Sequence, residues 1–225
     1  MKPITIRPFA ALKLMTLAAL ALLLLLLNGC EWAGERGNGK ITSETRAIDD
    51  FNSIVTDGAF TVNWTAGPAA LKITTDKNLL QFIRTSVSSD RLRIDWSKPL
   101  RGTEGIKVEI SSPSLKRAET NGAVKFTASN LSGSEFYLEA NGASKVTLSG
   151  NVNAVSAEMN GANKLYAESL VTRAMEVEIN GAGKAEVNAT QALKVVISGA
   201  GKVTYSGDPT VSKEINGAGK VRKRQ

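Results

Sequence analysis

The chain has 225 residues, a length typical of one domain, with 42% hydrophobic and 22% charged residues. It has no histidine and one cysteine, which excludes Ser–His and Cys–His nucleophile systems, most zinc sites and an internal disulfide framework. We therefore expect no bound metal and no cofactor. The formal net charge of +7 falls to +4 without the first 29 residues, a mild excess that does not indicate a nucleic-acid-binding protein.

Residues 1–29 have the features of a signal peptide. Three basic residues accompany an apolar run, Leu14 to Leu27, that is interrupted only by Thr16, and small polar residues follow it. The run is shorter than the roughly 20 residues of a membrane-spanning helix, so a transmembrane anchor is the less favoured alternative.

The end of this segment resembles a bacterial lipoprotein cleavage site. Leu27-Asn28-Gly29-Cys30 resembles the lipobox, in which the cysteine becomes the first mature residue and its thiol carries the lipid. The resemblance implies lipidation at Cys30 and attachment to a membrane. Glu31 follows the cysteine, and because aspartate is the usual retention signal there, the resemblance also implies an outer-membrane lipoprotein, either periplasmic or surface-facing.

Residues 30–40 are rich in glycine and charge, and we expect them to form a tether. Residues 41–118 contain runs that alternate between apolar and polar side chains, such as Arg91–Trp96, which predict the N-terminal β part of a domain. One short helix is predicted over Asn78–Arg84, with Asp76 or Asn78 as its cap.

Residues 119–225 form a repeat part of the same domain. The motif Glu-x-Asn-Gly-Ala-x-Lys begins at Glu119, Glu139, Glu158, Glu178 and Glu214, and a degenerate copy begins at Val196. The copies are 18–20 residues apart. A fixed period of this length indicates stacked or radial repeats.

Two all-β architectures fit this repeat. Asn-Gly between alternating runs is a strong hairpin signal and would give an antiparallel meander or barrel. A parallel β-solenoid would instead place one unit in each coil and bring equivalent residues about 4.8 Å apart. We favour the solenoid, because a meander gains nothing from repeating the same residue at each equivalent position.

The resemblance to a known family is specific. The repeat, the entry segment Thr45–Phe51, the stretch Asp76–Leu80 and the closing segment Val211–Gly219 resemble the bacterial head GIN domain family over about residues 41–223. This family is also called the putative auto-transporter adhesin family, or DUF2807. The resemblance implies a right-handed parallel β-helix of the pectin-lyase type, no recognised catalytic residues and a role in adhesion.

We expect the corner residues to have mainly structural roles. Stacked asparagine amides can bond from coil to coil, and glycine enters positive φ freely. The first corners depart from the family pattern, because Val124, Ser144 and Asn163 replace the second glycine. We expect the backbone of those corners to differ from that of the others.

Stacking would align two charged rows beside the corner. One is the glutamate row that begins each motif. The other, the lysine row, consists of Lys125, Lys145, Lys164, Lys184, Lys202 and Lys220. We expect the rows to neutralise each other in part. The lysine row is then either a solvated edge or a strip that binds an anionic polymer or a partner surface.

The sequence therefore favours a lipid-anchored cell-envelope protein that presents a rigid β-helical surface for adhesion or interaction. Its partner would be an envelope or host polymer or a protein. The sequence leaves open whether the protein forms a homo-oligomer. The first alternative is a carbohydrate- or polyanion-binding module. The second is a polysaccharide lyase or hydrolase with a cryptic site, although carboxylates such as Asp95 and Glu104 form no distinctive motif. We expect no enzymatic activity.

Overall fold

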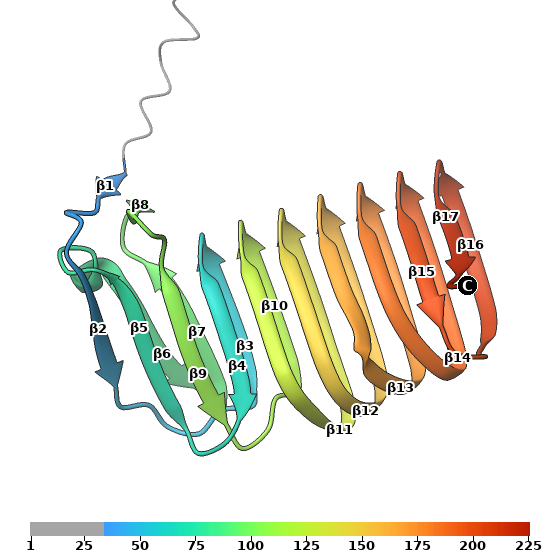
Figure 1. Ribbon diagram of the computed structural model, residues 1–225, viewed down its shortest axis with the longest axis horizontal. Coiled ribbons are helices and arrows are strands. Elements are labelled where there is room, and N and C mark those ends of the chain that lie inside the picture. The colour runs from blue at the N-terminus through green and yellow to red at the C-terminus, as the bar shows by residue number, and fades with distance from the viewer. Residues whose placement is uncertain (1–33) are drawn as a thin grey trace, which may run out of the picture. The chain divides into compact units, whose positions relative to one another are not determined.

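The computed structural model describes residues 34–225, in which Glu35–Gln225 form one compact unit. Cys30 and the signal segment lie outside the described residues, so their assignment stays a prediction. The described chain is built almost entirely from strands (Figure 1). Within it, no helix has the length and apolar character needed to cross a membrane.

The repeat part is a stack of parallel coils. Its strands are β10 (Arg117–Gly122), β11 (Lys125–Gly142), β12 (Lys145–Gly161), β13 (Lys164–Gly181), β14 (Lys184–Gly199), β15 (Lys202–Ser206), β16 (Thr210–Gly217) and β17 (Lys220–Lys223). Each long strand begins at the lysine of one motif and ends at the Asn-Gly of the next, or at Ser198-Gly199 in β14. Equivalent residues pair in register, as in Asn121 with Asn141 and Asn141 with Asn160. The predicted β-solenoid is confirmed, with about 5 turns, and the antiparallel meander is wrong.

The N-terminal part begins inside this stack and then leaves it. β3 (Ser53–Gly58) and β4 (Thr61–Ala66) form a coil that pairs with β10 and β11 on one side. On the other side, β7 (Arg91–Trp96) pairs with β3, and β9 (Lys107–Ser112) pairs with β4. The chain therefore runs outward from its first coil, builds the end of the solenoid, and returns to begin the repeats.

Antiparallel strands close this N-terminal end. β5 (Ala70–Asp76) pairs with β9 and with β2 (Ile41–Arg46), while β6 (Ile83–Ser88) pairs with β7. Two short strands, β1 (Glu35–Arg36) and β8 (Leu100–Arg101), pair with each other beside them (Figure 1). We call the part formed by β1, β2, β5, β6 and β8 the cap.

The predicted helix over Asn78–Arg84 is wrong. Only a single 3-10 turn, η1 (Leu80–Phe82), forms there, and β6 begins at Ile83. Hydrogen bonding to β7 takes the backbone from Ile83 onward into the sheet. The side chain of Asp76 makes no helix cap, because it binds two loops of the cap instead.

The core consists of the side chains that the alternation assigned to the interior. Phe136, Leu138, Val177, Ile179 and Val195 are all at most 2% exposed. Tyr205, assigned to the same interior set, is only partly buried because few strands cover the C-terminal end. The inside and outside faces of each repeat follow directly from its period of two.

The first glycine of each corner is required by the backbone. In the six corners from Gly122 to Gly217, its φ lies between 102° and 133°. A Cβ atom there would lie 2.5–2.7 Å from the carbonyl oxygen of the equivalent glycine in the preceding coil. Both constraints recur at every corner because the coils stack in register.

The residue two positions after the first corner glycine varies from corner to corner. This variation changes the packing of the corner but not its backbone hydrogen bonds. Val124, Ser144 and Asn163 are buried, and each corner makes the same bonds to the coil before it. The backbone differs only modestly, as expected: φ of the first glycine is 102–113° in these three corners and 126–133° in the three corners that have a second glycine. Where this position is glycine, an isoleucine of the preceding strand fills the space: a Cβ on Gly183 would lie 2.7 Å from Cγ2 of Ile179.

Candidate functional site: the lysine row

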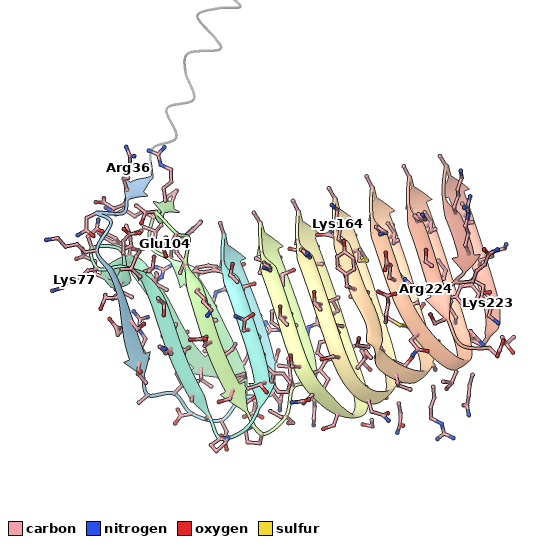
Figure 2. The ribbon with its side chains drawn as sticks, in the orientation of Figure 1. Arg36, Lys77, Glu104, Lys164, Lys223 and Arg224 are labelled. Carbon is pink, nitrogen blue, oxygen red and sulfur yellow. The ribbon has the colours of Figure 1, made fainter. Side chains whose placement is uncertain are left out.

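The structure brings all six residues of the predicted lysine row into one line. Lys125 pairs with Lys145, and the register continues through Lys164, Lys184, Lys202 and Lys220. Each backbone N–H of the row donates to a carbonyl of the preceding coil, over 2.8–2.9 Å. Figure 2 shows Lys164 near the strand ends that form this corner. The corner geometry therefore fixes the spacing of the positive charges.

Five of these six lysines have no carboxylate partner among the described residues. Lys184 is the exception, since it pairs with Glu186 and is half-buried, whereas the others are exposed. The hydrogen bond from Lys184 to Glu186 raises the pKa of that lysine above its ordinary value. Lys145 also lies 5.1 Å from the centre of the Tyr166 ring, a cation–π contact. The row is thus a line of exposed cations.

The glutamate row does not pair with the lysine row. Its members are in register on the strands that end at the corner, whereas the lysines begin the strands that leave it. Glu139 pairs with Arg117 over 2.7 Å, and no ion pair between the two rows occurs in the described part of the chain. The two rows therefore make no direct ion pair, and their partial neutralisation at longer range stays a prediction.

The glutamates instead support a ladder of asparagine amides. The Nδ2 group of Asn141 donates to Oδ1 of Asn121, and the same bond joins Asn160 to Asn141 and Asn180 to Asn160, over 2.9–3.0 Å. Each of these amides also donates to the glutamate two residues before it, over 2.9–3.1 Å. The ladder ends at Asp57, which accepts from Asn121. The predicted structural role of the asparagines is consistent with this geometry.

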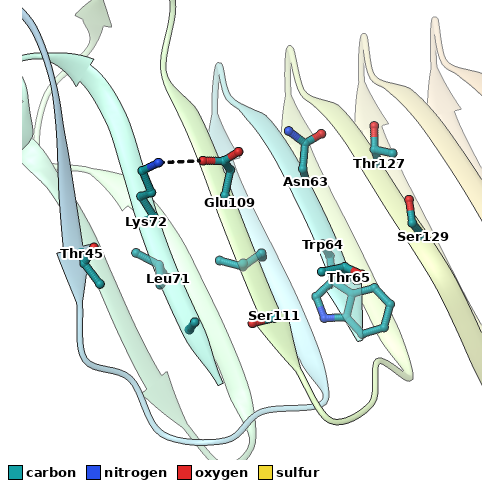
Figure 3. A pocket seen from close by; sticks show the side chains of 12 residues that line it. Thr45, Asn63, Trp64, Thr65, Leu71, Lys72, Glu109, Ser111, Thr127 and Ser129 are labelled. Atoms are coloured by element: carbon teal, nitrogen blue, oxygen red, sulfur yellow. Dashed lines mark ion pairs between the residues drawn. The ribbon is translucent and has the colours of Figure 1, made fainter. Parts of the chain in front are cut away.

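A groove lies beside the first coils, on the face that continues from the lysine corner (Figure 3). It has a volume of about 610 Å³, and its mainly apolar lining carries polar side chains that include Asn63, Thr127, Lys72 and Glu109. Hydrogen bonding to Lys107 lowers the pKa of Glu109, and Lys72 lies 3.5 Å from the same carboxylate. Such a groove can donate and accept hydrogen bonds, but it has no exposed aromatic platform, because the Trp64 ring is buried.

No pattern in the sequence predicts this groove. It is formed by β2, β5, β9, β4 and β11, strands that are far apart in the chain. Their side-by-side placement results from the outward detour of the N-terminal part, which no sequence period encodes. The runs of serine and threonine on those strands were the only available signal.

The carboxylates considered for catalysis do not converge. Asp95 pairs with Arg84 over 2.6 Å, while Glu104 is exposed on a loop of the cap. In residues 34–225 no group of three or more acidic or cysteine side chains is placed to hold a metal ion.

Comparison with known proteins identifies the fold and the family. Crystal structures of putative adhesins from Bacteroides fragilis and Parabacteroides merdae are 21% and 22% identical to the chain, with TM-scores of 0.69 and 0.52. They cover 85% and 84% of this chain, which in turn covers 100% and 98% of theirs. A structure from Parabacteroides distasonis, described as a putative lipid binding protein, is 24% identical, with a TM-score of 0.51 and coverage of 84% and 99%.

None of the curated proteins matches the chain. The family model described as "Putative auto-transporter adhesin, head GIN domain" matches residues 50–209, more than half of the chain. The in-register corners, the parallel coils and this match agree, and the chain belongs to the head GIN domain family.

Proposed function

We propose that this protein is a lipid-anchored, non-enzymatic component of the cell envelope that uses the lysine row to bind an anionic polymer. Membership of an adhesin family supports an adhesion-type role at the envelope or cell surface. The observation that carries the proposal is the line of in-register, exposed lysines, five of which lack a carboxylate partner in the described chain. If the lysines served only to keep this edge solvated, they would not need to be held apart from the neighbouring glutamates.

The spacing of the row favours repeated weak contacts. Neighbouring coils lie about 4.8 Å apart, so successive ammonium groups can meet successive anionic groups of an extended polymer. Each exposed ion pair contributes little, on the order of 0–1 kcal/mol, but linked contacts add by avidity. Because exposed charges are screened within about 8–10 Å at physiological salt, this binding should weaken steeply as salt rises.

The test replaces Lys145, Lys164, Lys184 and Lys202 together by glutamine. Binding of the purified protein to dextran sulfate, with neutral dextran as reference, should fall by at least tenfold at 50 mM salt while the circular dichroism spectrum stays unchanged.

The matched control is a variant in which Arg91, Lys116, Arg173 and Lys213 become glutamine. It removes the same charge from exposed positions outside the row that make no ion pair within residues 34–225. Equal loss in both variants would assign binding to net charge alone and contradict the role of the row.

The lipid anchor has its own test. A metabolically supplied radioactive fatty acid should label the wild-type protein at Cys30, and Cys30→Ala should abolish both the label and membrane association. Continued labelling of the Cys30→Ala protein would contradict lipidation at this residue.

A further inference from the structure

The cap carries a second group of basic side chains, separate from the lysine row. We call Arg36, Lys40, Lys77 and Arg101 the cap patch. All four are exposed, and none pairs with a carboxylate within the described chain. Figure 2 shows Arg36 and Lys77 at the same end of the solenoid, near Glu104. Lys98 of the same end is neutralised by Glu35, which lies 2.6 Å away.

Backbone bonds hold the patch together. Arg36 on β1 pairs in register with Arg101 on β8, so their side chains start from adjacent positions of a parallel ladder. The two arginines line a hollow of about 460 Å³ together with Gly102 and Thr103. Lys77 donates its backbone N–H to the carbonyl of Lys40 over 2.9 Å.

A buried carboxylate makes this surface rigid. Asp76 is fully buried and accepts hydrogen bonds from the backbone N–H of Gly39, over 2.6 Å, and of Thr103, over 2.8 Å. The Thr103 hydroxyl donates to the same carboxylate. Asp76 therefore clamps the loop after β1 to the loop after β8.

The chain length places this patch close to any lipid on Cys30. Glu35, the first residue of β1, is five residues after Cys30. Five residues span at most about 18 Å when fully extended. The cap is thus the part of the solenoid that the anchor holds nearest the membrane, within about two Debye lengths of the lipid headgroups.

We propose that the cap patch binds the phosphate groups of anionic phospholipids in the leaflet that holds the anchor. Arg36 and Arg101 flank one phosphate, and Lys40 and Lys77 contact its neighbours. Guanidinium groups present paired N–H donors that match phosphate oxygens. The proposal rests on the proposed lipid anchor for its geometry. It implies that the solenoid stands with its cap on the membrane while the lysine row extends away from it.

The experiment uses the mature chain with Cys30→Ser, so that binding does not depend on lipidation. To remove any contribution of the lysine row, its four central lysines are also replaced by glutamine. Binding to vesicles of 30% phosphatidylglycerol and 70% phosphatidylcholine is compared with binding to vesicles of phosphatidylcholine alone. We expect binding to the anionic vesicles only.

In this background, Arg36→Gln with Arg101→Gln should weaken partitioning about 25-fold, since each basic residue at an anionic surface contributes about a fivefold factor. The matched control, Lys213→Gln with Arg222→Gln, removes the same charge at the opposite end of the solenoid and should change partitioning less than threefold.

Two results would overturn the proposal: equal binding to both kinds of vesicle, or equal loss of binding in the two variants. Failure of fatty-acid labelling in the wild type, with vesicle binding intact, would overturn the anchor and leave the patch.

Discussion

Asp76 shows how one residue can organise a surface. Burial by itself would raise the pKa of its carboxyl group, but hydrogen bonds from Thr103 and Gly39 outweigh that effect and lower it below its ordinary value. A group whose pKa is lowered on folding stabilises the folded state above its unfolded pKa. That stabilisation is lost as pH falls from about 4 through the lower folded pKa.

We therefore expect Asp76→Asn to lower the free energy of unfolding by about 2 kcal/mol at pH 7, because it removes charge-assisted bonds to the Gly39 and Thr103 amides. Urea denaturation should show that the wild type loses most of this advantage at pH 3. Asp90→Asn, at an exposed turn, is the control and should match the wild type at both pH values. An advantage that persists at low pH would contradict the charge of Asp76 as its source.

Residues of the solenoid interior and exterior should differ sharply in their tolerance of change. Ile179 is fully buried, so Ile179→Asp places an unpaired charge in the core and should cost several kcal/mol. Glu178→Gln, one residue away, keeps an oxygen that can accept from Asn180 and should cost under about 0.5 kcal/mol. Equal losses in thermal unfolding would contradict the assignment of faces.

The period of two predicts which side chains are buried, because each residue of a strand contacts one face only. It predicts nothing about Asp76. The partners of that carboxylate are in loops 37 and 27 residues away, and two of its bonds come from backbone amides that any residue could supply. The cap patch was missed for the same reason, since Arg36 and Arg101 meet through a pairing that the chain pattern does not contain.

At the scale of the coil, the corner and the strand before it form one packing unit. The second glycine occurs where that strand carries isoleucine, as in Ile179 with Gly183, whereas Ala140 is combined with Ser144. The space between the corner and the strand is filled in both cases, either by the isoleucine of the strand or by the side chain of the corner residue.

A double-mutant cycle tests this exchange. Gly183→Ser should destabilise the protein by about 1–3 kcal/mol, because the new Cβ lies too close to Ile179. Ile179→Ala should also destabilise it, through a cavity. The combined change reproduces the Ala140 and Ser144 arrangement, so its loss should be smaller than the sum by more than 1 kcal/mol in chemical denaturation. Additive losses would mean that the two positions do not share a space.

The first glycine of the corner admits no such compensation. Gly181→Ala places a Cβ 2.6 Å from the carbonyl oxygen of Gly161 at a φ of 128°, so backbone rather than a side chain must move. We expect a loss of more than about 2 kcal/mol in the same measurement, exceeding that of Ala182→Gly at the exposed neighbouring position. A similar loss for both changes would show that the corner is not strained by a side chain.

The repeat was sufficient to predict a corner at each Asn-Gly and the solenoid itself. It could not predict that corners with different residues keep the same backbone hydrogen bonds, since that depends on packing across the coil. Nor could it predict that a strand would begin at Ile83, inside the expected helix, because that depends on pairing of β6 with β7.

At the scale of the whole molecule, the two ends differ. The N-terminal end is closed by the antiparallel strands of the cap, whereas the C-terminal end finishes with β16 and β17, which each pair with one neighbour. The basic residues Lys213, Lys220 and Arg222 are exposed on this last coil. Charge on an open sheet edge opposes pairing with another chain. The order of coils was not predictable, because the first coil in the sequence is an internal coil of the stack.

The asparagine ladder gives the molecule an electrical direction. In every bond between coils the amide N–H points toward the N-terminal coils, so the dipoles along these bonds add along the stack rather than cancel. The carboxylate of Asp57 meets the positive end of this line, much as an anion stabilises the start of a helix. Coils inserted between Asn121 and Asn180 would lengthen the line without altering either end, so the solenoid can grow by whole repeats from within.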